Sequence, residues 1–131
     1  MEANQPIRIY IVEDSQQIRT RLHEMLTRLG RAEIVGEAEN AHTAIDEILS
    51  LRPDIVILDF HLPGASGVQV LREVHPKAPA TMFVMLTNYP NAQYRRICLE
   101  AGASHFLDKS NEFMKINELV AGYREQRCSA A

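Results

Sequence analysis

Residues 53–67 have the sequence PDIVILDFHLPGASG, and this stretch decides the fold. A run of branched apolar residues at 55–58 ends abruptly at Asp59, and a turn-rich segment with Pro63 and Gly64 follows. An unbroken apolar run of this kind indicates a strand buried on both faces, as in the centre of a parallel sheet. Open parallel sheets bind their ligands beyond the carboxyl ends of the strands. Asp59 is therefore expected at such an edge, although an aspartate that only starts a turn would give the same local pattern.

Short apolar segments alternate with segments of helical periodicity along the whole chain. The expected strands are residues 7–12, 33–38, 55–58, 81–86 and 104–107. Ser15 and Asn40 are expected to begin the first two helices, Gly30 to end the first, and Phe113 to belong to the last. Strict alternation with short loops predicts an α/β fold, with helices on both faces of a parallel sheet. We expect a doubly wound, flavodoxin-like (βα)5 domain with strand order 2-1-3-4-5.

Length and composition point to one ordinary globular domain. The 131 residues suit a single domain spanning 1–131, with a core at about 7–125 and a loose tail at 126–131. A net charge of −3 argues against direct nucleic-acid binding, and no apolar run approaches the about 20 residues of a membrane span. Cys98 and Cys128 are expected to be free thiols, with Cys98 in the core, and we expect a cytoplasmic protein.

The residues that follow the expected strands form a chemically complementary set. They are Glu13, Asp14, Asp59, Thr87 and Lys109. Because the carboxyl ends of parallel strands share one edge, these side chains should meet in one cleft. Clustered carboxylates repel one another unless a positive charge lies among them. A few oxygen ligands suit Mg²⁺, whereas no Cys/His set suitable for zinc is present.

Such a set can carry phosphoryl chemistry. A carboxylate beside Mg²⁺ can attack a phosphoryl group and form an acyl phosphate. The ammonium of Lys109 and the hydroxyl of Thr87 would then neutralise, or donate to, the phosphoryl oxygens. Each residue type at this edge therefore has a distinct role in phosphoryl transfer.

Together with Pro63, Gly67 and the turn at 101–103, these residues resemble the receiver domain of bacterial two-component response regulators over about residues 7–125. The resemblance implies that Asp59 becomes a 4-aspartylphosphate, taking its phosphoryl group from a histidine kinase or a phosphotransfer protein. It implies that Mg²⁺ is held by Asp14, Asp59 and the backbone carbonyl of His61, with Glu13 in direct or water-mediated contact.

The resemblance also implies a switch. Thr87 and Phe106 would form the switch pair, and phosphorylation would remodel the surface of the fourth helix, fifth strand and fifth helix. That surface would bind a downstream protein partner, and the chain could form a homodimer through it. The chain would act as a signalling phosphoacceptor, not as an enzyme beyond its own phosphorylation and dephosphorylation.

Several positions depart from the pattern of the family. Phe106 lacks the hydroxyl of the tyrosine often found there. Ser110 replaces a common proline, and because a cis bond before a non-proline residue costs about 3–4 kcal/mol, we expect a trans Lys109–Ser110 bond. Asn88 is larger than usual beside the phosphoryl position. His61 and Tyr89 lie beside the path of a hydrolytic water, and we expect them to set the phosphoryl lifetime.

Other functions fit the sequence less well. We expect a stand-alone receiver, and the main alternative is an excised domain of a longer DNA-binding response regulator. An Mg²⁺-dependent phosphatase of the haloacid-dehalogenase type would have an acidic residue where His61 stands, and it would turn over phosphate esters. A flavin binder would have a glycine-rich first loop and would be yellow. A degenerate receiver would lack part of the acidic, threonine and lysine set.

Overall fold

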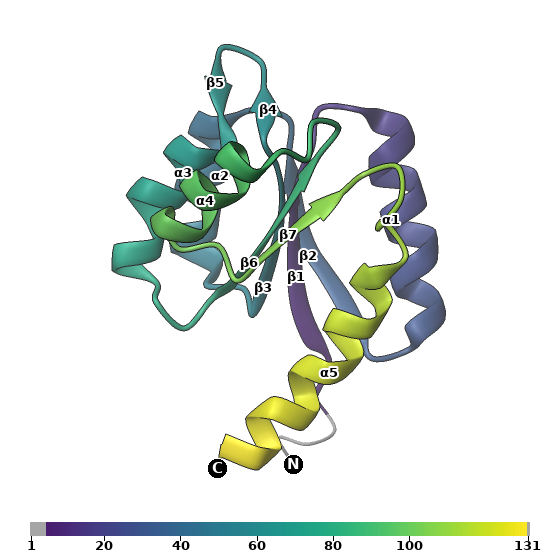
Figure 1. Ribbon diagram of the computed structural model, residues 1–131. Helices are drawn as coiled ribbons and strands as arrows, with labels where there is room; N and C mark the ends of the chain where they lie inside the picture. Colours follow the sequence, from purple (N-terminus) through teal and green to yellow (C-terminus); the bar gives the residue numbers. More distant parts are fainter. Residues whose placement is uncertain (1–4, 131) are drawn as a thin grey trace.

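A five-stranded parallel sheet lies between two layers of helices in the computed structural model (Figure 1), which describes the backbone of residues 5–130 and the side chains of residues 5–123. Its strands are β1 (Ile7–Val12), β2 (Ala32–Ala38), β3 (Ile55–Asp59), β6 (Met82–Thr87) and β7 (His105–Asp108). They run in the order β2-β1-β3-β6-β7, and every neighbouring pair is parallel. The predicted fold and strand order are confirmed.

Two helices cover one face of the sheet and three cover the other (Figure 1). The first layer consists of α1 (Gln16–Leu29) and α5 (Lys115–Ala130), and the second of α2 (Ala41–Leu51), α3 (Gly67–Val74) and α4 (Ala92–Ala101). The expected cap residues are confirmed, since the Ser15 and Asn40 side chains accept from backbone N–H groups and Gly30 ends α1 with φ 71°. Within the described residues, no helix combines the length and apolarity needed to cross a membrane.

Alternation along each strand divides the core into two clusters. Ile9 and Ile11 of β1 pack towards α1 and α5, whereas Tyr10 and Val12 pack towards α2, α3 and α4. All of β3 is buried, as its unbroken apolar run predicts. Cys98 is a buried free thiol in the second cluster, and burial raises its pKa to about 11. The side chain of Cys128 lies outside the described residues.

The structure differs from the expected elements on both sides of α3. Between β3 and α3, a small antiparallel hairpin pairs β4 (His61–Leu62) with β5 (Ala65–Ser66), where the turn-rich segment suggested only a loop. A 3₁₀ turn, η2 (His75–Lys77), follows α3. The hairpin returns the chain to the end of β3, where the N–H of Gly67, the first residue of α3, donates to the carbonyl of Phe60 at 2.7 Å.

The last helix also differs from the prediction. Phe113 precedes α5 instead of belonging to it, although its side chain is buried against α1 as an apolar helix residue would be. The backbone of α5 stays helical to Ala130, so most of segment 126–131, expected as a tail, lies in this helix. The side chains of that segment lie outside the described residues.

We predict that Gly67→Ala lowers the free energy of unfolding by about 1–3 kcal/mol, the usual range for overpacking. A Cβ at this position would lie 2.3 Å from the backbone oxygen of Asp59 and 2.9 Å from Cε of Met85. Chemical denaturation would measure the loss. The control is Gly122→Ala in α5, where a Cβ meets nothing within 4 Å and alanine favours the helix. Equal stability of the two variants would contradict the prediction.

Candidate functional site

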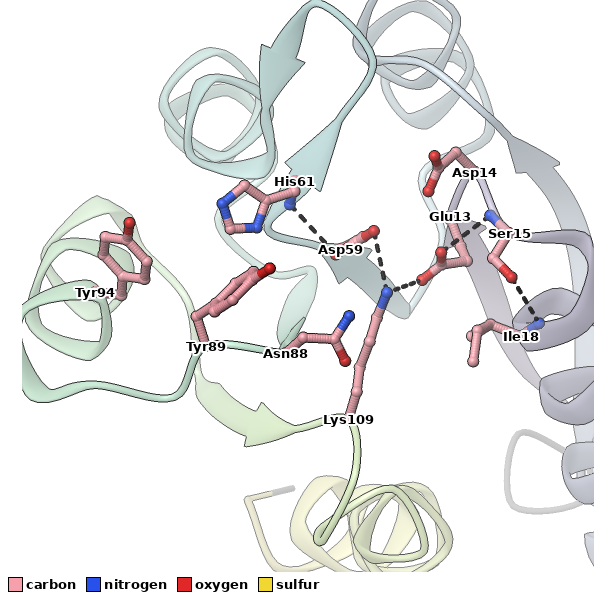
Figure 2. A pocket seen from close by; sticks show the side chains of 10 residues that line it. All are labelled: Glu13, Asp14, Ser15, Ile18, Asp59, His61, Asn88, Tyr89, Tyr94 and Lys109. Carbon is pink, nitrogen blue, oxygen red and sulfur yellow. Dashed lines mark hydrogen bonds and ion pairs between the residues drawn. The ribbon is translucent and has the colours of Figure 1, made fainter.

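The carboxyl edge of the sheet carries an open pocket of about 670 Å³ (Figure 2). Its lining residues are Glu13, Asp14, Ser15, Ile18, Asp59, His61, Asn88, Tyr89, Tyr94 and Lys109. These residues come from the ends of β1, β3, β6 and β7 and from the segments that follow them. The pocket opens where β1 and β3 are neighbours, which is the point at which the strand order reverses. Of the residues that the sequence places at this edge, Glu13, Asp14, Asp59 and Lys109 line the pocket and Thr87 does not.

Lys109 connects the two buried carboxylates of the pocket. Its Nζ lies 2.8 Å from Oε1 of Glu13 and 3.1 Å from Oδ2 of Asp59. All three side chains are at most 9 % exposed, so solvent screens these contacts little. The backbone N–H of Lys109 donates to the carbonyl of Thr87, which ties the lysine to the end of β6. Figure 2 shows the lysine reaching across the floor of the pocket to both carboxylates.

Burial dominates the electrostatics of this group. Removal from water raises the pKa of Glu13 and of Asp59, and the contacts with Lys109 only partly offset that effect. Burial also opposes the charge on Lys109, but its hydrogen bond to Glu13 and the charge of Asp59 outweigh burial and raise its pKa. The lysine therefore stays cationic. A further positive charge beside the two carboxylates would stabilise their charged forms.

A third carboxylate completes an acidic cluster. Oxygens of Glu13, Asp14 and Asp59 all lie within 4.8 Å of one another, and Asp14 is exposed where the other two are buried. Hard oxygen ligands on a partly solvated edge fit Mg²⁺, which keeps several waters when it binds to proteins. Among the described residues, this is the one group of three or more metal-ligating side chains. The donor set therefore fits the magnesium ion that the sequence predicts.

Local backbone structure fixes Asp59 at the edge. It is the last residue of β3, and its Oδ1 accepts a hydrogen bond from the backbone N–H of His61 at 3.2 Å. Phe60 is anchored on both sides, because its N–H donates to Leu86 and its carbonyl accepts from Gly67. The absence of a side chain at Gly67 lets α3 begin directly against the backbone of Asp59. The carboxylate is thus held in one orientation at the pocket floor.

Aromatic rings and His61 form one rim of the pocket. The His61 ring lies 5.3 Å from the ring of Tyr89 and 6.2 Å from that of Tyr94, edge to face in both cases. Tyr94 in turn stacks on Phe60 at 4.6 Å. Tyr89 is 61 % exposed, so this rim stands in solvent beside the opening (Figure 2). In Figure 2, His61 and Tyr89 lie on one side of Asp59, and Glu13 and Asp14 lie on the other.

Thr87 and Phe106 do not line the pocket. Thr87 is fully buried at the end of β6, and its hydroxyl accepts from the backbone N–H of Tyr89 at 3.0 Å. Phe106 pairs with Met85, two residues before Thr87, so the two side chains project from the same face of adjacent strands. Phe106 is 6 % exposed and packs within the cluster beneath α4. Their role as a switch pair stays a prediction.

The loop after Lys109 is held by side chains. Every peptide bond of the described chain is trans, which confirms the expected trans Lys109–Ser110 bond. The carboxylate of Asp108 accepts from the backbone N–H of Ser110 and from the side-chain amide of Asn111, both at 2.9 Å. The backbone N–H of Asp108 donates to the side-chain carboxylate of Glu112 at 3.0 Å. This short network fixes the loop from which Lys109 enters the pocket.

Some residues of the site were not expected from the sequence. Ser15, Ile18 and Tyr94 also line the pocket, although the sequence pattern indicates only a helix cap and two helix faces at these positions. Their positions in the chain could have indicated this role, because each stands in or just before the first turn of a helix that follows a loop at the carboxyl edge. No sequence pattern marks Arg19, yet its guanidinium donates to the backbone carbonyl of Glu13 at 2.7 Å.

Comparisons with known proteins agree with this geometry. The family model described as "Response regulator receiver domain" matches residues 9–121. A protein-glutamate methylesterase/protein-glutamine glutaminase of Hahella chejuensis is 34 % identical over 110 residues, which are 82 % of this chain and 28 % of that protein. The chain thus spans less than a third of the length of this relative.

Solved structures show the same fold. A two-component response regulator of the LuxR family from Aurantimonas sp. is 26 % identical, with a TM-score of 0.79 over 90 % of this chain and 87 % of that one. The response regulator domain of Thermotoga maritima CheB is 24 % identical, with a TM-score of 0.79 over 92 % and 96 %. With the matched region covering most of its length, the chain belongs to the response regulator receiver domains.

Proposed function

We propose that the chain receives a phosphoryl group on Asp59 from a phosphorylated histidine of a kinase or phosphotransfer protein. The observation that carries this proposal is the position of the Lys109 ammonium between Glu13 and Asp59, beside a third carboxylate in an open pocket. A buried aspartate with a cation at hydrogen-bond distance can act as a nucleophile, while the same cation stabilises the charge that arrives.

The chemistry assigns a role to each side chain. An oxygen of Asp59 forms a bond to phosphorus as the bond from phosphorus to the donor nitrogen breaks, and that nitrogen keeps the electron pair. Lys109 and the hydroxyl of Thr87 would bind the phosphoryl oxygens. Glu13, Asp14, Asp59 and the backbone carbonyl of His61 would hold Mg²⁺, and that ion would offset the negative charge of the carboxylates and the phosphoryl group.

The output would pass through the face of α4, β7 and α5. Thr87 would move towards the phosphoryl oxygens, and Phe106 would repack behind it, because both project from one face of adjacent strands. That movement would change the surface offered to a downstream protein partner or to a second copy of the chain. The chain itself would catalyse only its own phosphorylation and dephosphorylation.

A receiver within a longer effector protein is the second candidate. It is favoured by one observation, since the matching methylesterase aligns over only 28 % of its own length. In that arrangement, the same phosphorylation would control an attached effector in place of a separate partner. In both versions of the proposal, the protein acts in the cytoplasm.

We predict that incubation with Mg²⁺ and a small phosphodonor such as acetyl phosphate adds the mass of one phosphoryl group to the wild type. Asp59→Asn should remain unmodified because its amide is not a nucleophile. Intact-mass spectrometry measures the adduct. A wild type that binds Mg²⁺ and takes no phosphoryl group from a phosphorylated histidine donor either would overturn the proposal.

The raised pKa of Asp59 gives a pH dependence of stability. Because burial lifts its pKa above the ordinary value, the charged form is disfavoured in the folded chain, so stability falls as pH rises through that folded-state pKa. We expect Asp59→Asn to melt at a higher temperature than the wild type at neutral pH with a chelator present, and the difference to vanish in acid.

Circular dichroism melts at both pH values would measure this difference. Asp46→Asn serves as the matched control, since the side chain of Asp46 is 71 % exposed on α2 and should respond little. A lower melting temperature for Asp59→Asn at neutral pH would show that the contacts with Lys109 outweigh burial, contrary to the expectation.

The rim of His61 and Tyr89 generates a prediction about lifetime. Replacing both by alanine opens the side of the pocket beside Asp59, so water should reach the acyl phosphate more easily and dephosphorylation should accelerate severalfold. Loss of the adduct with time, followed by intact mass, gives the rate. His42→Ala on exposed α2 is the control. An unchanged rate in the double variant would show that these rings do not govern access.

A further inference from the structure

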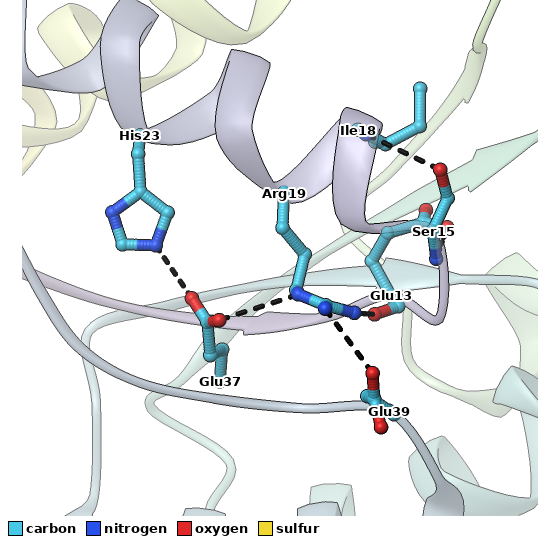
Figure 3. A network of polar contacts seen from close by, with 7 residues as sticks. All are labelled: Glu13, Ser15, Ile18, Arg19, His23, Glu37 and Glu39. Carbon is cyan, nitrogen blue, oxygen red and sulfur yellow. Dashed lines mark hydrogen bonds and ion pairs between the residues drawn. The ribbon is translucent and has the colours of Figure 1, made fainter.

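Arg19 joins two loops at the acidic edge of the sheet (Figure 3). It lies in the first turn of α1, and its guanidinium makes three contacts with oxygens outside that helix. Nε lies 3.3 Å from Oε1 of Glu37, and one terminal nitrogen lies 3.2 Å from Oε1 of Glu39. The other terminal nitrogen donates to the backbone carbonyl of Glu13 at 2.7 Å. The side chain is only 12 % exposed, so the group is largely removed from water.

These contacts hold the backbone that carries the acidic cluster. The backbone N–H of Glu13 donates to Ala38 of β2, while its carbonyl accepts from Arg19. The carboxylate of Glu13 also accepts from the N–H of Ser15 through Oε2 and contacts Lys109 through Oε1. Arg19 is therefore the side chain that fixes the peptide between Glu13 and Asp14, the two residues whose carboxylates leave the end of β1.

We propose that Arg19 is a positioning residue for the divalent-cation site, a role that rests on the Mg²⁺ site of the proposed function. Its charge pairs with Glu37 and Glu39, neither of which belongs to the acidic cluster, and its contact with Glu13 is to the backbone carbonyl (Figure 3). Its contribution is geometric. The planar guanidinium spans three oxygens at once, and it thereby sets the direction in which Asp14 and Glu13 point.

Geometry and charge make opposite predictions at this position. If only charge mattered, removing a cation from the edge would strengthen the binding of Mg²⁺. If Arg19 orders the loop, removing it would weaken binding, because the carboxylates would have to be ordered when the ion arrives. Lysine separates the two effects, since it keeps the positive charge but cannot reproduce the planar fork of donors.

The test compares Arg19→Lys and Arg19→Gln with the wild type by isothermal titration calorimetry with MgCl₂. We expect both variants to bind Mg²⁺ about tenfold more weakly, the lower limit typical of changes behind a metal ligand. Arg28→Lys, an exposed position near the end of the same helix, is the matched control and should bind as the wild type does. Circular dichroism would verify that each variant is folded, and Arg19→Gln carries the test if the lysine variant does not fold.

A second readout distinguishes positioning from general damage. With acetyl phosphate as donor, the Mg²⁺ concentration that gives half-maximal phosphorylation should rise in Arg19→Lys, while the rate at saturating Mg²⁺ should stay near that of the wild type. Unchanged or tighter Mg²⁺ binding in both variants would overturn the role of Arg19 alone. A wild type that binds no Mg²⁺ would overturn the proposed site, and this inference with it.

Discussion

The arrangement of the carboxyl edge depends on one interaction, the ammonium of Lys109 lying between the buried carboxylates of Glu13 and Asp59. Two carboxylates removed from water at this distance would otherwise repel each other, and one of them would take up a proton. A single cation held by two contacts cannot satisfy them fully, because burial still leaves both carboxylate pKa values raised. A further cation beside these two carboxylates would therefore stabilise their charged forms.

Chain topology explains why these particular residues meet. Strands β1 and β3 are adjacent only because the order reverses there, and Glu13, Asp14 and Asp59 stand at their carboxyl ends. Parallel strands buried on both faces offer no other polar surface to the interior. The charged groups therefore gather at the strand ends, where backbone N–H groups and solvent stabilise their charge.

The sequence predicted the parts of the site that follow from periodicity and chain order. Residues at strand ends, such as Asp59 and Lys109, could be placed because a buried strand has a clear end and all parallel strands finish at one edge. Residues whose long side chains contact another element could not be placed in this way. Arg19 could not be predicted, because the helical pattern locates only the apolar face of α1, and its contact with Glu37 depends on how β2 pairs with β1.

The same limit explains the small errors in the elements. The hairpin of β4 and β5 is only two residues long on each side, too short for any periodic signal, and it depends on Gly64 with φ 71°. Phe113 has helical spacing from Ile116 but belongs to the turn before α5. In that turn the N–H of Asp108 donates to the Glu112 carboxylate, and the N–H of Glu112 donates to the carbonyl of Asp108. In both regions, local polar contacts determine the backbone conformation, whereas the spacing of apolar residues indicates only which side chains are buried.

The loop after β7 shows how such contacts can replace a covalent constraint. Ser110 leaves the backbone without the rigidity of a proline ring, and the Lys109–Ser110 bond is trans. Asp108 supplies the missing restraint, since its carboxylate binds the N–H of Ser110 and the amide of Asn111. Because Lys109 stands directly after Asp108, restraint of this loop limits the directions in which the lysine can extend. The two carboxylates in the pocket then determine which of those directions it takes.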